Sequence, residues 1–359
     1  MKISKNLLKF EGTGTKVYIP TERYSIDLSL TENPLKFSPK VLDVIDKEKV
    51  NINHYPDPYH NDLRQALSKK LGIHEKNFIF GTGADGLIEN IARILINHGE
   101  KVVIPDLSFL NVSFATIIAG GEVIFSKMKN DFHIDFADLK SKIDNQTKMV
   151  FLCNSNNPTG LLETKEDILD LVKSTDALVV VDEANIEFAG ESVIGYVNDF
   201  ENLLVIRTFS KGYGLAGMRI GYCAGNEELM YYIWRLRPPF TNTYLAQKTA
   251  LVALADENHL GKSKDYVSKE RKYLAEELSK RGLTVIPSEA NCFLVKVTPL
   301  FQSSTEFNEQ LHKHDCTVVD GKYFRGLGTD YVRVAPQLHE TNEKFINIVD
   351  RLLKNVGSR

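Results

Sequence analysis

Seven short apolar runs between residues 77 and 225 constrain the fold of this 359-residue chain more than any other feature. They are "NFIFG", "KVVIP", "GEVIF", "KMVFLCN", "ALVVVDE", "LLVIRTFS" and "RIGYCAG". Several are apolar at every position, which indicates strands that are buried on both faces, as in a mainly parallel sheet covered by helices. Segments with helical spacing lie between them, for example "ADGLIENIARILI". The pattern predicts an α/β architecture.

The pattern changes after about residue 250. A long charged segment, "GKSKDYVSKERKYLAEELSKRG", predicts a helix, and the short strands and two further helices after it predict a smaller α+β domain. A chain of this length also exceeds the usual size of one core. We therefore predict an N-terminal segment (residues 1–40) that packs on both domains, a large domain (41–250) and a small C-terminal domain (251–359).

The composition excludes several classes of protein. A hydrophobic content of 43% and a charged content of 25% are typical of an ordinary globular chain and not of a disordered one. The net charge of −3, without a long basic block, argues against a nucleic-acid partner. The first 20 residues contain no apolar core long enough for a signal peptide, and no apolar run reaches about 18 residues, so we predict a cytoplasmic protein without a membrane partner.

The cysteines and histidines do not indicate a metal site. The four cysteines are scattered and form no CxxC pair, so neither a zinc site nor a disulfide framework is predicted. The "HKH" at residues 312–314 lies in a charged, helix-like stretch without a third ligand nearby, and we interpret it as a solvated face. No metal is predicted.

Polar or glycine-rich sequence follows four of the predicted strands. The segments are "GTGADG", "NSNNPTG", "DEANIEF" and "TFSKGYG". Because ligands bind beyond the carboxyl ends of the strands in an open parallel sheet, these segments are candidates for one shared site.

The first segment, "GTGADG", directly precedes a predicted helix. Free N–H groups at a helix start, together with the positive end of the helix dipole, suit a phosphate. Simple helix capping by Asp85 is the alternative. The glycine spacing matches neither a Walker loop nor a dinucleotide-binding fingerprint.

Asp182 and Lys211 suggest a more specific chemistry. Asp182 follows "ALVVV" at the edge of a buried layer, where an unpaired carboxylate is costly. A protonated heterocyclic nitrogen within about 4 Å would attract it by about 4 kcal/mol at an effective dielectric constant near 20, and would act as an electron sink. Lys211 can form a Schiff base with an aldehyde, while Ser210 and Arg219 can bind a phosphate. A turn cap and solvated loop charges are the alternatives.

The ordered blocks "NNPTG", "DEANIEF" and "TFSKGYGLAGMRIGY" resemble the fold-type I enzymes that use pyridoxal 5′-phosphate (PLP). The resemblance is to the histidinol-phosphate aminotransferase branch of the class I/II aminotransferases. "TENPLKFSPKVLD", "HYPDPYHNDLRQAL", "LRPPFTNT" and "ANCFLV" also look like blocks of that branch, so the resemblance spans about residues 28 to 350.

The resemblance implies a role for each matching residue. Lys211 would carry the cofactor and move the substrate proton, Asp182 would hold the ring nitrogen protonated, and Asn157 would bind the ring O3′ and lie beside the substrate. The phosphate would be bound by the backbone of Ala84 and Asp85, by the Ser210 hydroxyl and by Arg219. Tyr55 would reach the neighbouring subunit's cofactor, which implies a homodimer. Arg333 would bind the carboxylate or phosphate of the substrate.

Three positions depart from the family pattern. Asn185 stands where the family has a tyrosine that shares the O3′ contact, Leu107 stands where an aromatic ring stacks on the cofactor, with Phe109 two residues on, and Gly86 replaces a glutamate. Loss of one hydrogen bond at O3′ costs about 1 kcal/mol. The sequence therefore predicts an aminotransferase acting on an amino acid or amino-alcohol phosphate and a 2-oxo acid. The alternative is a decarboxylase, lyase or O2-dependent oxidase that uses the same cofactor.

Overall fold

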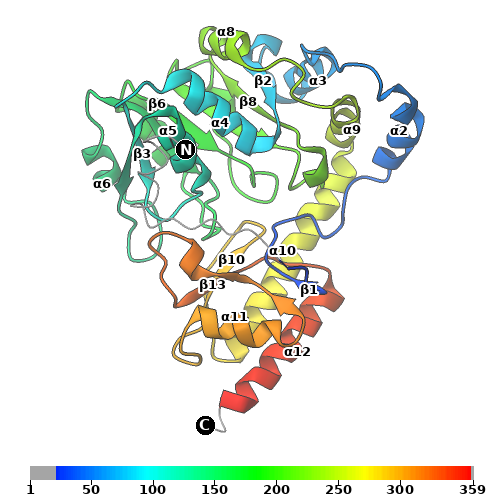
Figure 1. The fold of residues 1–359 in the computed structure, drawn as a ribbon, viewed down its shortest axis with the longest axis vertical. Helices are drawn as coiled ribbons and strands as arrows, with labels where there is room; N and C mark the ends of the chain where they lie inside the picture. Colours follow the sequence, from blue (N-terminus) through cyan, green and yellow to red (C-terminus); the bar gives the residue numbers. More distant parts are fainter. Residues whose placement is uncertain (1–21, 357–359) are drawn as a thin grey trace, which may run out of the picture.

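A seven-stranded sheet forms the centre of the large domain in the computed structural model, which describes residues 22–356 (Figure 1). Its strand order is β2-β8-β7-β6-β5-β3-β4. The strands are β2 (Phe78–Gly81), β3 (Lys101–Pro105), β4 (Glu122–Ser126), β5 (Thr147–Cys153), β6 (Leu178–Asp182), β7 (Leu203–Thr208) and β8 (Gly221–Gly225). Each of the seven apolar runs therefore forms a strand.

The sheet is mainly parallel, and β8 is the exception. β8 pairs antiparallel with both β2 and β7, whereas the pairs from β7 through β4 are parallel. In the register of β5 and β6, Cys153 lies opposite Asp182 at the carboxyl ends of the two strands. The candidate residues that follow β5, β6 and β7 are therefore brought to one edge of the sheet.

Helices cover both faces of this sheet, because successive strand residues alternate between two apolar cores. Val180 and Leu204 belong to the core beneath α4, α5 and α8, whereas Val179 and Val205 belong to the core on the opposite face. The helices of the first face are α4 (Gly83–Leu95), α5 (Asn111–Ala119) and α8 (Glu227–Leu236). Those of the second face include α2 (Lys40–Glu48), α3 (Asn61–Leu71), α6 (Phe136–Ser141), α7 (Lys165–Lys173) and α9 (Tyr244–Ala255). Burial on both faces explains the unbroken apolar runs.

The C-terminal part has its own sheet and its own core. Its antiparallel strands follow the order β12-β13-β10-β9. The elements are β9 (Thr284–Val285), β10 (Phe293–Lys296), α11 (Ser304–His312), β11 (Cys316–Thr317), β12 (Val319–Asp320), β13 (Tyr331–Val334) and α12 (His339–Val356). Phe293, Phe307 and Phe345 are buried in this core, which is separate from the two cores of the large sheet.

The described part of the N-terminal segment contacts both domains. β1 (Ile26–Asp27) pairs with β11 of the small domain, and Asn33 Nδ2 donates to the carbonyl of Gly212 in the large domain at 2.8 Å. Residues 1–21 of this segment lie outside the described residues. The proposed domain boundaries at residues 41 and 251 stay predictions.

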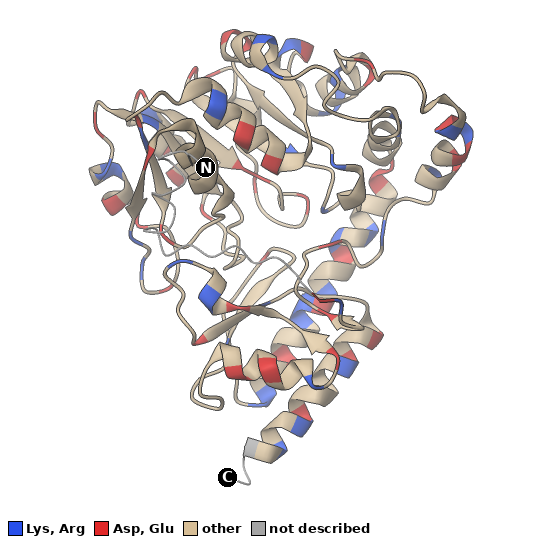
Figure 2. Ribbon diagram, in the orientation of Figure 1, with Lys and Arg blue, Asp and Glu red and all other residues tan. Residues whose placement is uncertain are grey.

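α10 (Glu257–Lys280) runs from the large domain along the small one. Lys, Arg, Asp and Glu residues cover much of α10 and α12, while the central sheet carries few of them (Figure 2). Within residues 22–356, no helix is long and apolar enough to cross a membrane.

Candidate active site

A cavity of about 430 Å³ lies at the carboxyl edge of the large sheet, where the large domain meets the small domain and residues 30–32. Its lining includes nine of the eleven residues predicted from the sequence: Ala84, Asp85, Asn157, Asp182, Asn185, Ser210, Lys211, Arg219 and Arg333. Leu107 and Tyr55 are not part of this lining. The cavity thus collects the ends of four strands in one place.

Asp182 is the last residue of β6 and is 3% exposed. Its Oδ1 accepts a hydrogen bond from the backbone N–H of Ala184 at 3.0 Å. Burial raises the pKa of Asp182 to about 7, an effect that this hydrogen bond and the charge of Lys211 only partly offset. A buried carboxylate with so raised a pKa is suited to a cationic partner.

Lys211 follows β7 and extends into the same cavity. Its Nζ donates to the hydroxyl of Thr31 at 2.5 Å. Burial, assisted by the positive charge of Arg333, lowers the pKa of Lys211 to about 8. A lysine amine that is partly neutral near physiological pH can act as a nucleophile and as a proton acceptor.

The start of α4 and Arg219 form a cradle for an anion. Ala84 and Asp85 lie in the first turn of α4, whose N-cap, Thr82, makes no side-chain capping bond. Arg219 Nη1 approaches Ser210 Oγ at 3.4 Å, and Arg219 Nη2 approaches Asp85 Oδ2 at 3.4 Å. Backbone N–H groups at a helix start, a hydroxyl and a guanidinium are the groups that bind phosphate.

At two positions in the first turn of α4, Gly83 and Gly86, a side chain would collide with a neighbouring residue. A Cβ on Gly83, whose φ is +74°, would lie 2.8 Å from Arg219 Nη2, so a side chain would displace the guanidinium from the cradle. A Cβ on Gly86 would lie 2.0 Å from Thr82 Oγ1. The glutamate usual at this position would therefore require Thr82 to turn away.

Arg333 lies on β13 and approaches the cavity from the small domain. Its Nη1 donates to Asn157 Oδ1 at 2.7 Å, its Nη2 donates to the carbonyl of Ser29 at 2.5 Å, and its guanidinium lies over the Phe324 ring at 5.4 Å. These contacts hold the guanidinium plane in one orientation, which favours bidentate binding of a carboxylate or phosphate.

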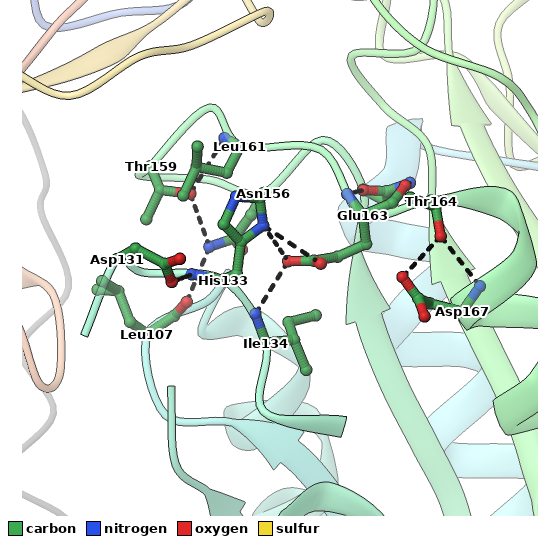
Figure 3. A network of polar contacts seen from close by, with 11 residues as sticks. Leu107, Asp131, His133, Ile134, Asn156, Thr159, Leu161, Glu163, Thr164 and Asp167 are labelled. Atoms are coloured by element: carbon green, nitrogen blue, oxygen red, sulfur yellow. Dashed lines mark hydrogen bonds and ion pairs between the residues drawn. The ribbon is translucent and has the colours of Figure 1, made fainter. Parts of the chain in front are cut away.

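Hydrogen bonds hold Asn156 and Glu163, which lie in the chain on either side of Asn157 (Figure 3). Asn156 Nδ2 donates to the carbonyl of Leu107 at 2.9 Å, and Glu163 accepts from the backbone N–H of Ile134 at 2.9 Å. His133 Nδ1 lies 3.3 Å from the same carboxylate. The contacts of Asn156 with Leu107 and of Glu163 with Ile134 therefore fix the backbone around Asn157.

Leu107, which stands where the family has an aromatic ring that stacks on the cofactor, is not part of the cavity lining. Leu107 is 2% exposed and packs with Leu294 and Leu327, away from the cavity. Phe109, two residues later, lines the cavity. The chain has left β3 at Pro105, so the alternation of the strand no longer determines which of these side chains faces the site.

Tyr55 lies on the surface, outside the cavity of its own chain. It is 81% exposed, and its ring lies 4.7 Å from that of Phe240. Val50 and Ile52 nearby in the sequence are 74% and 66% exposed. The single chain therefore leaves Tyr55 exposed beside the Phe240 ring, which is itself 42% exposed.

The sequence did not identify several residues of the cavity wall. Thr31 and Glu32 enter it from the N-terminal segment, and Tyr323 and Phe324 enter it from the small domain. Thr31 and Glu32 belong to the block "TENP" (residues 31–34), but no local pattern shows that this segment contacts the lysine loop, the segment after β7 that carries Lys211. The two aromatic residues follow β12 in a stretch that carries no periodic signal.

The arrangement fits PLP. Asn185 is 6% exposed, lines the cavity, and its Oδ1 has no hydrogen-bond partner among residues 22–356, so a polar group of a ligand can occupy that position. Asp182 suits a protonated ring nitrogen, Lys211 an aldehyde, and the α4 cradle a phosphate. Fold and site together define a fold-type I PLP-dependent enzyme.

Comparison with known proteins identifies the family. Residues 25–352 match the family "Aminotransferase class I and II", and the chain belongs to this family. The histidinol-phosphate aminotransferase of Methanococcus aeolicus is 38% identical over 334 residues, which cover 91% of this chain and 90% of that protein. The enzyme of the same description from Methanothermobacter thermautotrophicus is 35% identical over 332 residues, covering 92% and 89%.

Solved structures agree in fold. The histidinol-phosphate aminotransferase of Clostridium acetobutylicum has a TM-score of 0.86 at 29% identity and covers 92% of this chain and 99% of its own. That of Sinorhizobium meliloti, solved in complex with PLP, has a TM-score of 0.88 at 22% identity and covers 99% and 96%. The predicted family, α/β fold, enzyme class and cofactor are confirmed: this chain is a PLP-dependent aminotransferase with small-molecule amino and keto substrates.

Proposed function

We propose that this enzyme transfers the amino group of histidinol phosphate to a 2-oxo acid. The geometry that carries the proposal is the placement of Arg333. Three cationic side chains from residues 22–356 line the cavity, and Lys211 and Arg219 lie among the groups that suit the cofactor. Arg333 reaches the cavity from the small domain, where it contacts Asn157, and suits the anionic group of a substrate. Relatives described as histidinol-phosphate aminotransferases, at 35–38% identity, support the phosphate as that group.

Each residue has a proposed part in the reaction. When bound, PLP supplies an aldehyde and a protonated ring that accepts electrons. Asp182 would keep the ring nitrogen charged, because a cation beside the Asp182 carboxylate offsets the cost of burying that carboxylate. Asn157 and Asn185 would hold the ring hydroxyl, and Ala84, Asp85, Ser210 and Arg219 would hold the cofactor phosphate. Lys211 would act as the base that takes and returns the substrate proton.

A half-reaction tests the proposal. Histidinol phosphate is added to the PLP-loaded enzyme without an acceptor, and the absorbance of bound PLP is expected to change to that of pyridoxamine phosphate. Histidinol, histidine and phosphoserine are the comparison donors, and the first two lack the phosphate. A preference for another donor would overturn the substrate. Release of CO2, ammonia or peroxide without an acceptor would instead favour the decarboxylase, lyase or oxidase alternative.

We also propose that two copies form the working enzyme. The exposed patch around Tyr55 and Phe240 supports a second copy as the covering partner, since large exposed aromatic residues indicate an interface. In such a homodimer Tyr55 would bind the phosphate of the partner's cofactor. Light scattering measures the mass, and a monomer at assay concentration would contradict the proposal. The cytoplasmic location stays a prediction.

A further inference from the structure

The hydrogen bond between Lys211 and Thr31 joins the reactive amine to the N-terminal segment. Nζ and Oγ1 are 2.5 Å apart, and Thr31 is 8% exposed. The partner is thus a neutral hydroxyl, although Asp182 and Glu32 also line the cavity.

Thr31 is itself held in place by its surroundings. Its carbonyl accepts from Asn291 Nδ2 at 2.9 Å, and Asn291 is 2% exposed. Two residues further on, Asn33 Nδ2 donates to the carbonyl of Gly212 at 2.8 Å, next to Lys211 in sequence. The hydroxyl therefore has a fixed position relative to the lysine loop.

A hydroxyl has two advantages over a charged partner at this point. It can accept from an ammonium and can donate to a neutral amine, so it remains bonded in both protonation states. A carboxylate would favour the ammonium and raise the pKa of Lys211, whereas a working base needs a pKa near the operating pH. A lysine side chain also has considerable rotamer freedom, and one fixed partner reduces it.

We propose that Thr31 is a positioning residue, whose hydroxyl holds the Lys211 amine while that amine is not bonded to the cofactor. That is the state in which the amine moves the substrate proton. The inference rests on the proposed role of Lys211, and it assigns to the "TENP" segment a part in the proton transfer itself.

Thr31→Val tests the proposal, because it removes the hydroxyl and keeps the shape. We expect kcat to fall about tenfold or more, with KM within about twofold. The deuterium isotope effect measured with a donor labelled at the reacting carbon should rise, because proton transfer becomes slower relative to the other steps. Thr31→Ser should restore both values.

A second readout needs neither cofactor nor substrate. The pH dependence of Lys211 acetylation in the cofactor-free protein, followed by mass spectrometry, gives the apparent pKa of the amine. In Thr31→Val both protonation states lose the hydroxyl, but the hydrogen bond to the charged ammonium is the stronger one, so this pKa should fall by about 1, and Thr31→Ser should retain it.

Ser38→Ala is the matched control. Ser38 is a hydroxyl residue of the same segment that donates to Asp256 Oδ2 at 2.6 Å and does not line the cavity. It should change neither kcat nor the acetylation profile. If Thr31→Val does not fold, Thr31→Ala removes the same hydroxyl and carries the same expectations.

The outcomes separate this proposal from the proposed function. Failure of histidinol phosphate as a donor would overturn the substrate, and the acetylation profile would still test Thr31. An unchanged acetylation pKa, together with an unchanged kcat and isotope effect in Thr31→Val, would overturn the role of Thr31.

Discussion

The two walls of the cavity are built in different ways. The large-domain wall consists of residues at the ends of β6 and β7 and at the start of α4, with Asp182 as the last residue of its strand. The opposite wall is assembled from distant segments: Arg333 reaches Ser29 across 304 positions, and Lys211 reaches Thr31 across 180. The first wall is positioned by the sheet, whereas the second depends on contacts between segments that are far apart in the sequence. Under the proposed function, the first wall would hold the cofactor and the second would bind the anionic group of the substrate, and the hydrogen bond from Arg333 to Asn157 joins the two.

Lys211→Ala should have the largest effect on the reaction rate, because it removes the reactive amine of the large-domain wall. General base catalysis contributes 10²–10⁴-fold, so the single-turnover rate with the best donor should fall by about 10³-fold or more. The rate is followed by the cofactor absorbance, and urea unfolding of both proteins serves as the control for folding. A rate within tenfold of the wild type would remove Lys211 from its assigned role.

Asp182→Asn should reveal the free-energy cost of burying the Asp182 carboxylate in the cofactor-free protein. The pKa of Asp182 in the folded protein is about 7 and its ordinary value is 3.8. Between about pH 4 and pH 7 the folded state therefore binds more protons than the unfolded state, and the free energy of unfolding falls as the pH rises. The contribution is about 4 kcal/mol.

Urea unfolding of the cofactor-free proteins measures this difference. Wild type and Asp182→Asn should have similar stability near pH 4, and the wild type should be the less stable at pH 8. Burial also raises the pKa of Glu187 to about 7, but Glu187 is present in both proteins, so its contribution cancels in the difference between their free energies of unfolding. Parallel pH profiles for the two proteins would contradict the assignment.

Arg333→Gln should separate the two walls. Removal of a charge-assisted pair costs about 1.5–3 kcal/mol, so kcat/KM should fall about 10- to 100-fold. The affinity for PLP, measured by titration, should stay within about twofold. Arg333→Lys keeps the charge without the planar fork and should be intermediate. An equal loss of PLP affinity would show that the walls are not independent.

Tyr55→Phe should have the smallest effect and tests a contribution from outside the chain. Loss of one hydrogen bond is worth about 1 kcal/mol, so the affinity for PLP should fall about fivefold in the dimer. Tyr59→Phe is the matched control, since Tyr59 is also exposed, at 51%. An unchanged PLP affinity in Tyr55→Phe would leave the cavity complete within one chain.

The sequence was sufficient to predict the residues of the large-domain wall, which follow the strands of the sheet. Apolar runs locate the strands, and polar residues at their ends, such as Asp182 and Lys211, reach the cavity because a parallel sheet brings those ends together. The antiparallel direction of β8 was not predicted, because an apolar run carries no sign of direction. That Phe109 and not Leu107 lines the cavity could not be predicted from strand alternation, because both residues lie beyond the end of β3. Thr31 was missed because its position depends on Asn291, 260 residues away.

α10 has a consequence for motion between the walls. Its 24 residues form a rod about 36 Å long that begins at the large domain and extends along the small one. A tilt of about 5° at its first turn would carry the far end by about 3 Å. Asp256 caps this turn by accepting from the backbone N–H of His259 at 3.4 Å. A change of tilt at this turn would therefore displace the far end of the helix much more than the turn itself.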